Sequence, residues 1–550
     1  MRLTAVLVTF LLIHCTCNFV SSENVTVDIP QLGKVIGTIE STLWTEQPYM
    51  SFLGIPYAES PSGARRFQAS VGKRPWKHPW DATKFGKRCP EKATIRKLQP
   101  KELEEDLEDC LNLCVYTKDF NKSATVMFYI YGGGFNNGSN SDHPPKHLLE
   151  KDIVLVVPNF RVGALGWLSD LTKKLPGNLP LKDILLALEW VKKHIKHFGG
   201  DSSKITIFGQ SAGAAQTGAL LLSPLTPKGT FRNAIMQSGS IFAEWAIELH
   251  PKQQVSRICE ALNCISCEGE EDMYSCFNNA TVPELLNATE KEFFAPTVGD
   301  YYGVLPKHPI KLLKKYSQTF PIMTGFTRDD GSYVLADYYD EVKQEGKIPF
   351  MTVRDFADGL IEYSANMQNT RLSRNLLILT LFPAHRLDSR EHKINIPSYF
   401  DLTSIIRMKS PIIDHSDKFS QNKKENSTYL YTFYYTGEHT RFGYEYGNEH
   451  YPFNGGVHHS NDNIYLFSTH KLNEADTEMA KNIVSIWTSF AINGVPSTES
   501  GMALPPMETP DGPYFHINTD ITIDDNVLKE FTAAFDDPQR NKLIRPNIEF

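Results

Sequence analysis

Ser211 stands at the centre of the pentapeptide Gly-Gln-Ser-Ala-Gly at residues 209–213, a pattern that can present a nucleophilic hydroxyl group. The apolar residues 205–208 predict a buried strand before it, and the small residues 212–222 predict a helix after it. A strand that turns directly into a helix needs glycines at the bend and leaves the serine at its tip, facing the helical N–H groups. Because such a pentapeptide also arises by chance, a nucleophile at Ser211 requires a base, an acid and an oxyanion hole elsewhere in the chain.

A run of three glycines supplies candidate donors for an oxyanion hole. Gly132, Gly133 and Gly134 directly follow a predicted buried strand at residues 126–130. Glycines carry no side chain, so their backbone N–H groups can approach a substrate oxygen closely. Together with the N–H group of Ala212, just after the serine, this run predicts an oxyanion hole.

Two adjacent pairs of residues are the candidates for the acid and the base. Asp329 and Asp330 come shortly after a predicted strand at residues 320–324, and His458 and His459 lie in a late loop before an apolar segment. A histidine can take the proton of a serine hydroxyl if a carboxylate orients its ring. The order nucleophile, acid, base along the chain is that of the α/β-hydrolases. The residues alone leave open which member of each pair acts.

The elements that must position these groups alternate between strands and helices. Buried strands that alternate with amphipathic helices predict an α/β fold with a mostly parallel central sheet and helices on both faces. The clearest strands are expected at residues 126–130, 153–157, 205–208, 320–324 and 429–434, and the clearest helices at 181–198, 212–222 and around 479–490.

The N-terminal residues indicate the secretory pathway. A basic residue, an apolar stretch and small residues make residues 1–22 a predicted signal peptide, so we expect a secreted, extracellular protein. Six Asn-x-Ser/Thr sequons are candidate glycosylation sites, namely Asn24, Asn121, Asn137, Asn279, Asn287 and Asn426. No other stretch of the chain is long and apolar enough for a membrane span. The formal net charge of −8, without a basic run, argues against nucleic-acid partners.

Seven cysteines remain after the predicted signal peptide. An oxidising compartment favours disulfides over the competing interpretation, a zinc site at the Cys-x-x-Cys of Cys264 and Cys267. The odd number leaves at least one free thiol or an intermolecular bond. Cys89 and Cys110 bracket a loop of about 20 residues, and a bridge between them would stabilise the fold by about 3 kcal/mol.

At this point the sequence resembles the type-B carboxylesterase family, which includes carboxylesterases and cholinesterases, and in particular its secreted non-specific invertebrate members. The matching segments run nearly from end to end and include residues 52–59, 108–113, 131–135, 159–166, 198–200, 209–213, 231–239, 456–459 and 487–491. The resemblance implies that residues 23–550 form a single α/β-hydrolase domain, which hydrolyses a small-molecule ester and needs no metal or organic cofactor.

The resemblance also assigns roles to residues. It implies Ser211 as nucleophile, Asp330 as acid, His459 as base, and the N–H groups of Gly133, Gly134 and Ala212 as the oxyanion hole. The acid is usually Glu in this family, so the shorter Asp330 requires a closer approach to the histidine. The family's pairing implies the disulfides Cys89–Cys110 and Cys264–Cys276. Cys259–Cys267 is an additional candidate bridge, and Cys114 is expected to be a buried free thiol.

Two departures from the cholinesterases bear on the substrate. Cholinesterases carry Glu where this chain has Gln210, and they hold a cationic group on a tryptophan in the first disulfide loop, where residues 90–109 here contain no aromatic residue. We therefore expect uncharged esters, with an apolar pocket lined by Phe294 and its neighbour Phe293 and by Tyr333. Two alternatives remain, namely a catalytically inactive adhesion or binding member of the same fold and a specialised lipid or hormone esterase.

Overall fold

The structure is a computed structural model that describes residues 24–97, 99, 101–267, 269–316, 320–364, 371–421, 427–447, 449–532 and 537–550. The predicted signal peptide at residues 1–22 and the sequon at Asn426 lie outside the described residues. Among the helices of these ranges, none combines the length and the apolar composition that crossing a membrane requires.

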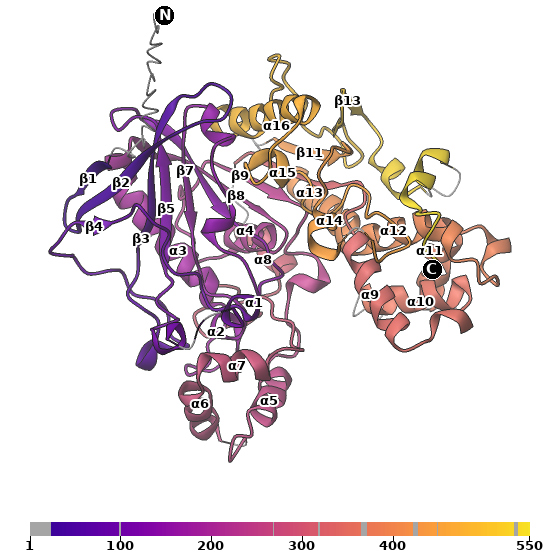
Figure 1. Cartoon of the computed structure of the whole chain (residues 1–550), viewed down its shortest axis with the longest axis horizontal. Helices are drawn as coiled ribbons and strands as arrows, with labels where there is room; N and C mark the ends of the chain where they lie inside the picture. The colour runs from indigo at the N-terminus through magenta and orange to yellow at the C-terminus, as the bar shows by residue number, and fades with distance from the viewer. Residues whose placement is uncertain are drawn as a thin grey trace, which may run out of the picture.

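One large open sheet organises the molecule (Figure 1). Within the described residues it has 13 strands, and its centre, in the order β7-β6-β8-β9-β10-β11-β12, is entirely parallel. The parallel strands are β7 (Ile153–Pro158), β6 (Ala124–Ile130), β8 (Gly200–Gln210), β9 (Asn233–Gln237), β10 (Ile322–Thr327), β11 (Thr428–Phe433) and β12 (Tyr514–Ile517). The mostly parallel α/β fold predicted from the sequence is confirmed.

Antiparallel strands extend this centre on both sides. On the N-terminal side, strands β1, β2, β3 and β5 form a meander that joins β7, and the short β4 pairs with β2. On the C-terminal side, β13 (Ile521–Asp524) pairs with β12. The bounds of the N-terminal strands are β1 (Asn24–Ile29), β2 (Gly33–Ser41), β3 (Pro48–Pro56), β4 (Trp80–Asp81) and β5 (Asn112–Thr117).

Helices cover the parallel strands on both faces. The helices α4 (Ala212–Leu222) and α16 (Glu474–Asn493) both pack on β6, β8 and β9 but not on each other, as helices on opposite faces of a sheet do. Every residue of β7 is buried, as a strand covered on both faces requires. The helix expected at residues 181–198 forms as α3 (Leu179–His194) and then tightens to a 3₁₀ turn at Ile195–Phe198.

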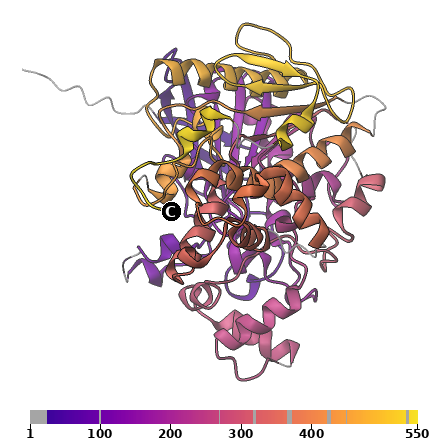
Figure 2. The ribbon, with the colours of Figure 1, turned by 90° about the vertical axis from the view of Figure 1, so that its right-hand side faces the viewer.

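Two groups of helices stand out among those not yet described. The helices α9 to α12 enclose a second hydrophobic core, and α5 to α7 project away from the sheet in both views (Figures 1 and 2). Their bounds are α1 (Lys92–Ile95), α2 (Gly163–Trp167), α5 (Pro251–Ala261), α6 (Glu270–Asn279), α7 (Val282–Ala288), α8 (Pro309–Tyr316), α9 (Ser332–Gln344), α10 (Val353–Ser364), α11 (Arg371–Leu381), α12 (Ile396–Ser404), α13 (Ser410–Ser420), α14 (Arg441–Tyr446) and α15 (Asn463–Leu466).

Three disulfides link the cysteines. The structure joins Cys89 to Cys110, and the disulfides Cys259–Cys267 and Cys264–Cys276 tie α5 and α6, respectively, to the segment between these helices. Because Cys264 and Cys267 belong to two different disulfides, neither thiol is available to a metal ion. Cys114 is a free thiol buried in β5, and burial raises its pKa to about 12.

Candidate active site

The predicted catalytic groups converge at one edge of the sheet. Ser211 follows β8, Asp330 follows β10, and the glycine run follows β6, so all three lie beyond the carboxyl ends of parallel strands. The segment after β11 contributes His459. The carboxyl edge of a parallel sheet is where α/β proteins place their ligands, because loops from neighbouring strands meet there.

Ser211 sits in the strained bend that the pentapeptide predicts. Its φ and ψ of 57° and −126° lie outside the regions that non-glycine residues ordinarily occupy, a conformation that costs on the order of 1–3 kcal/mol. The bend is held because the Ser211 N–H donates to the Gln237 carbonyl at 2.8 Å and the Ser211 carbonyl accepts from the Ala215 N–H at 3.1 Å. A side chain on Gly213 would collide with the carbonyl oxygen of Ile130, so this position requires glycine.

Asp330, and not Asp329, faces His459. Oδ1 of Asp330 lies 2.5 Å from Nδ1 of His459, and Oδ2 accepts a hydrogen bond from the Thr327 N–H at 2.9 Å. The carboxylate is fully buried, whereas 14% of the His459 side chain is exposed. A buried carboxylate at Nδ1 fixes the ring orientation and leaves Nε2 as the basic nitrogen that faces the cavity.

The neighbouring acid and histidine have structural partners. Asp329 forms an ion pair with Arg540 and accepts from the Val457 N–H at 2.8 Å. His458 is buried, with Nδ1 2.6 Å from the Ser332 hydroxyl and Nε2 3.6 Å from the Glu445 carboxylate. Both residues therefore brace the loop that carries His459.

Gln210 contacts the base directly, which the sequence did not reveal. Its amide Nε2 lies 3.2 Å from Nε2 of His459, and with the Nδ1 proton directed at Asp330 the amide can donate to the ring lone pair. The Ser211 hydroxyl makes no hydrogen bond among the described residues, although it lines the same cavity. Catalytic hydrogen bonds of this kind often tighten only when substrate binds.

The glycine run lies against the nucleophile. A Cβ atom on Gly132 would stand 2.9 Å from the Ser211 Cβ, so only a bare backbone fits there. Gly133 and Gly134 adopt φ values of 115° and 58°, which favour glycine. Among the hydrogen bonds of the described residues, none uses the N–H groups of Gly133, Gly134 or Ala212. These three donors are available to a substrate oxygen.

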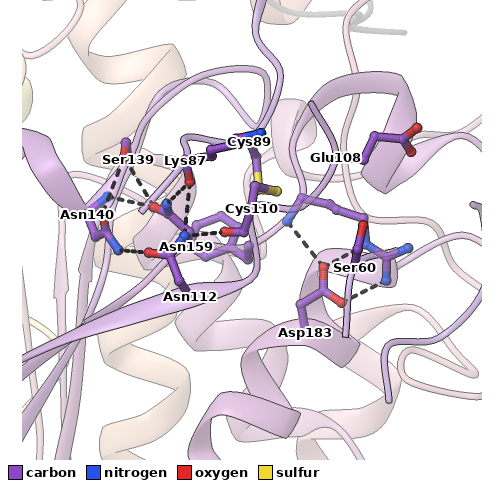
Figure 3. The surroundings of a disulfide bond; sticks show 12 residues. Ser60, Lys87, Cys89, Glu108, Cys110, Asn112, Ser139, Asn140, Asn159 and Asp183 are labelled. Atoms are coloured by element: carbon purple, nitrogen blue, oxygen red, sulfur yellow. Dashed lines mark hydrogen bonds and ion pairs between the residues drawn. A yellow bond between two sulfur atoms is a disulfide. The ribbon is translucent and has the colours of Figure 1, made fainter. Parts of the chain in front are cut away.

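A buried polar network anchors the segment that follows this glycine run (Figure 3). The Asn159 side chain accepts from the Asn140 N–H at 2.7 Å, and the Asn112 side chain accepts from the Asn140 amide at 3.0 Å. Asn112 in turn donates to the carbonyl of the disulfide-bonded Cys110 at 2.9 Å. The Cys89–Cys110 bridge therefore supports the oxyanion loop through neighbouring asparagines.

The cavity above Ser211 has a volume of about 620 Å³ and combines aromatic with charged walls. Tyr333 lines it, with its ring centroid 5.2 Å from that of His459. The prediction for Phe294 is wrong, because its side chain is buried in the core, while the adjacent Phe293 lines the cavity. The expected apolar lining is also incomplete, since the walls include Arg88, Glu91, Asp142, Asp337, Arg407, Arg441 and Glu445.

Comparison with known proteins identifies the family. Residues 23–535 match the Carboxylesterase family. The chain belongs to this family. This match spans nearly the whole chain, and it confirms the predicted family and the predicted enzyme class, a carboxylic ester hydrolase.

Individual relatives of this carboxylesterase-family chain are similar over most of its length. Juvenile hormone esterase of Tribolium castaneum is 30% identical over 514 residues, which are 86% of this chain and 84% of that protein. Esterase FE4 of Myzus persicae is 30% identical over 521 residues, covering 89% of this chain and 88% of that protein. Glutactin of Drosophila melanogaster is 29% identical over 510 residues, but the matched region covers only 48% of that longer protein.

Proposed function

We propose that the chain is a serine ester hydrolase that works through Ser211, His459 and Asp330. The observation that carries the proposal is the 2.5 Å contact between Asp330 and His459 beside a strained serine and three unused N–H donors. A base held by a buried carboxylate, a nucleophile and an oxyanion hole are together what acyl transfer requires.

The reaction begins when Nε2 of His459 leaves the Gln210 amide and accepts the proton of the Ser211 hydroxyl, which attacks the ester carbonyl carbon. The negative charge that develops on the carbonyl oxygen meets the N–H groups of Gly133, Gly134 and Ala212. His459 then protonates the departing alcohol, and a water molecule releases the acid from the acyl-enzyme by the reverse sequence. Asp330 stabilises the imidazole of His459 whenever it is protonated and positively charged.

Uncharged esters are the proposed substrate class. Gln210 places an amide, not a carboxylate, next to His459, and so adds no negative charge to attract a cationic group. The relatives include enzymes named for juvenile hormone and for choline esters, so family membership alone does not select the ester. The amide at this one position is what favours aryl and alkyl esters without a cationic group.

Hydrolysis of short aryl esters by the purified chain, with the Ser211→Ala variant as control, tests this function. We expect wild-type turnover, inhibition by organophosphates and a loss in Ser211→Ala of at least about 10³-fold. Thiocholine esters should react more slowly than aryl esters. Equal inactivity of both proteins across the panel would instead support the inactive binding member of the fold.

We further propose that the protein is secreted and glycosylated. Disulfides are typical of oxidising compartments, and the five described sequon residues Asn24, Asn121, Asn137, Asn279 and Asn287 are exposed. A mass decrease of the secreted chain after treatment with a peptide N-glycosidase would support this compartment, and an unchanged mass together with retention in the cytosol would contradict it.

A further inference from the structure

Most charged side chains that line the cavity lie in ion pairs with one another. Arg88 pairs with Glu91 at 2.7 Å and with Asp142 at 2.5 Å, and Arg441 pairs with Glu445 at 2.7 Å. These pairs leave no guanidinium group unpaired, and the two carboxylates on Arg88 leave one negative charge in excess.

Arg407 is different, because no carboxylate of the described residues lies within 4.0 Å of its guanidinium group. Nη1 donates to the carbonyl of Ser364 at 2.9 Å, whereas Nε is buried without a hydrogen-bond partner among the described residues. A guanidinium group has five N–H donors, and a buried donor left without an acceptor costs about 1–3 kcal/mol. Nε is shielded from the cavity, so a ligand can meet this guanidinium only through its Nη groups, of which Nη1 already donates to Ser364.

The position of Arg407 is fixed by its surroundings. It lies in a π-helical turn, Ile405–Lys409, between α12 and α13, and such turns are frequent at functional sites. Its guanidinium carbon lies 5.9 Å from the ring centroid of Trp245, whose indole N–H donates back to the Arg407 carbonyl at 2.9 Å. The charge is therefore held against one wall of the cavity before any ligand arrives.

The Tyr333 side chain lies between this wall and the proposed catalytic base, His459. The Arg407 guanidinium is near enough to the Tyr333 hydroxyl to favour its ionised form, although burial dominates and raises the pKa of Tyr333. The Tyr333 ring in turn stacks obliquely beside the His459 ring, at 5.2 Å between centroids. A substrate whose ester group lies at Ser211 can thus extend toward Arg407 within the same cavity.

We propose that Arg407 binds a carboxylate carried by the substrate, so that the chain also hydrolyses monoesters of dicarboxylic acids or esters of hydroxy acids. This inference rests on the proposed function and adds acidic esters to the uncharged ones. Water cleaves the ester bond in the usual way, and the second carboxylate takes no part in the chemistry. Arginine suits this role because its planar fork matches the two oxygens of a carboxylate.

Asp337 is the counter-charge on this side of the cavity. Tyr446 donates to its Oδ1 at 3.1 Å, and burial raises the pKa of Asp337 to about 6. At neutral pH its charge opposes an incoming carboxylate, so neutralising Asp337 and neutralising Arg407 should have opposite effects on acidic esters. Opposite effects of the two substitutions on acidic esters would indicate recognition of charge, whereas a general loss of folding would lower the activity of both variants.

The test compares acidic esters with neutral amides of the same shape. One pair, 4-acetoxybenzoate and 4-acetoxybenzamide, carries the group on the alcohol part, and the other, monophenyl adipate and phenyl adipamate, carries it on the acyl part. The variants are Arg407→Met, which keeps length without charge, Asp337→Asn, and Arg232→Met as an exposed arginine at the start of β9, the far end of the strands.

We expect Arg407→Met to lower kcat/KM for the acidic member of one pair by roughly tenfold or more, mainly through KM, and to leave its neutral member nearly unchanged. Asp337→Asn should shift the same ratio toward the acidic ester, and Arg232→Met should not shift it. Equal losses on acidic and neutral esters would show that Arg407 only packs against Trp245 and would overturn the proposal.

A binding measurement keeps the two proposals separable. Calorimetric titration of the Ser211→Ala protein with 4-hydroxybenzoate and with adipate should show binding that is lost in Ser211→Ala/Arg407→Met. If the wild type hydrolyses neutral esters but neither carboxylate binds, the acidic-substrate inference fails alone. If carboxylates bind through Arg407 but no ester is turned over, the hydrolase proposal fails instead.

Discussion

Arg540, near the C-terminus, ties the loop that carries the acid to helix α12. It forms ion pairs with Asp329 and with Asp401, and all three side chains are buried, with 8%, 2% and 2% of their surface exposed. Arg328 completes the cluster through a 2.8 Å contact with Asp401. The four formal charges sum to zero, so the substitution Arg540→Met leaves one buried negative charge uncompensated.

The magnitude follows from which carboxylate loses its partner. Asp401 keeps Arg328 at 2.8 Å, whereas Asp329 retains only the same guanidinium at 4.0 Å. Breaking a buried ion pair in this way typically costs about 3–5 kcal/mol. With an unfolding entropy of about 2.1 cal/mol/K per residue, that cost lowers Tm by roughly 3–4 °C for a chain of this length. Because Asp329 also holds the Val457 N–H, esterase activity should fall as well.

The double variant Asp329→Asn/Arg540→Met provides the decisive comparison. It removes the uncompensated negative charge of Asp329, and the asparagine oxygen can still accept from the Val457 N–H. We therefore expect the double variant to regain at least half of the decrease in Tm and at least half of the lost activity. Thermal unfolding and aryl-ester turnover of the wild type, both single variants and the double variant measure this coupling. A double variant no more stable than Arg540→Met, or an Arg540→Met protein with unchanged Tm, would refute the reasoning.

Two further predictions concern the oxyanion loop and the charged cavity wall. Gly133→Ala should reduce kcat by about 10²–10³-fold, because the new Cβ atom would collide with the Asn137 carbonyl and the φ of 115° disfavours alanine. Gly72→Ala is the control, since a Cβ atom there meets open space. Full activity in Gly133→Ala would contradict the assigned oxyanion hole. Asp337→Asn should raise Tm at pH 8 by about 2 °C but barely change it at pH 4. Burial raises the pKa of Asp337 to about 6 in the folded protein, whereas the pKa in the unfolded chain is near 3.8. The ionised carboxylate therefore destabilises the folded protein increasingly as pH rises above 3.8, and asparagine removes this effect. An equal gain at both pH values would point to an effect other than ionisation.

The bend around Ser211 was predictable because its requirements are local. The residues 209–213 and the adjoining apolar and small residues specify strand, turn and helix without reference to the rest of the chain. The parallel sheet followed from alternating buried strands and helices in the same way. For the pairs Asp329/Asp330 and His458/His459 the residues alone gave no preference, since neighbouring loop residues have similar composition and only their direction differs.

Other features depend on contacts between distant segments. Phe293 and Phe294 lie in an irregular segment without a period, so the sequence did not reveal which ring faces the cavity. Arg407 comes from a π-helical turn almost 200 residues after Ser211, and nothing in its neighbourhood marks it as a cavity residue. Likewise, the contact between Gln210 and His459 arises only when the loop after β11 closes over β8.

The buried thiol of Cys114 has a consequence for the covalent integrity of the chain. Thiol–disulfide exchange proceeds through the thiolate, and with a pKa of about 12 the ionised fraction at pH 7 is on the order of one molecule in 10⁵. The folded protein can therefore carry an unpaired cysteine among three disulfides without reshuffling them or crosslinking to a neighbour. Mispairing through Cys114 is therefore confined to molecules in which β5 is not yet buried in the sheet.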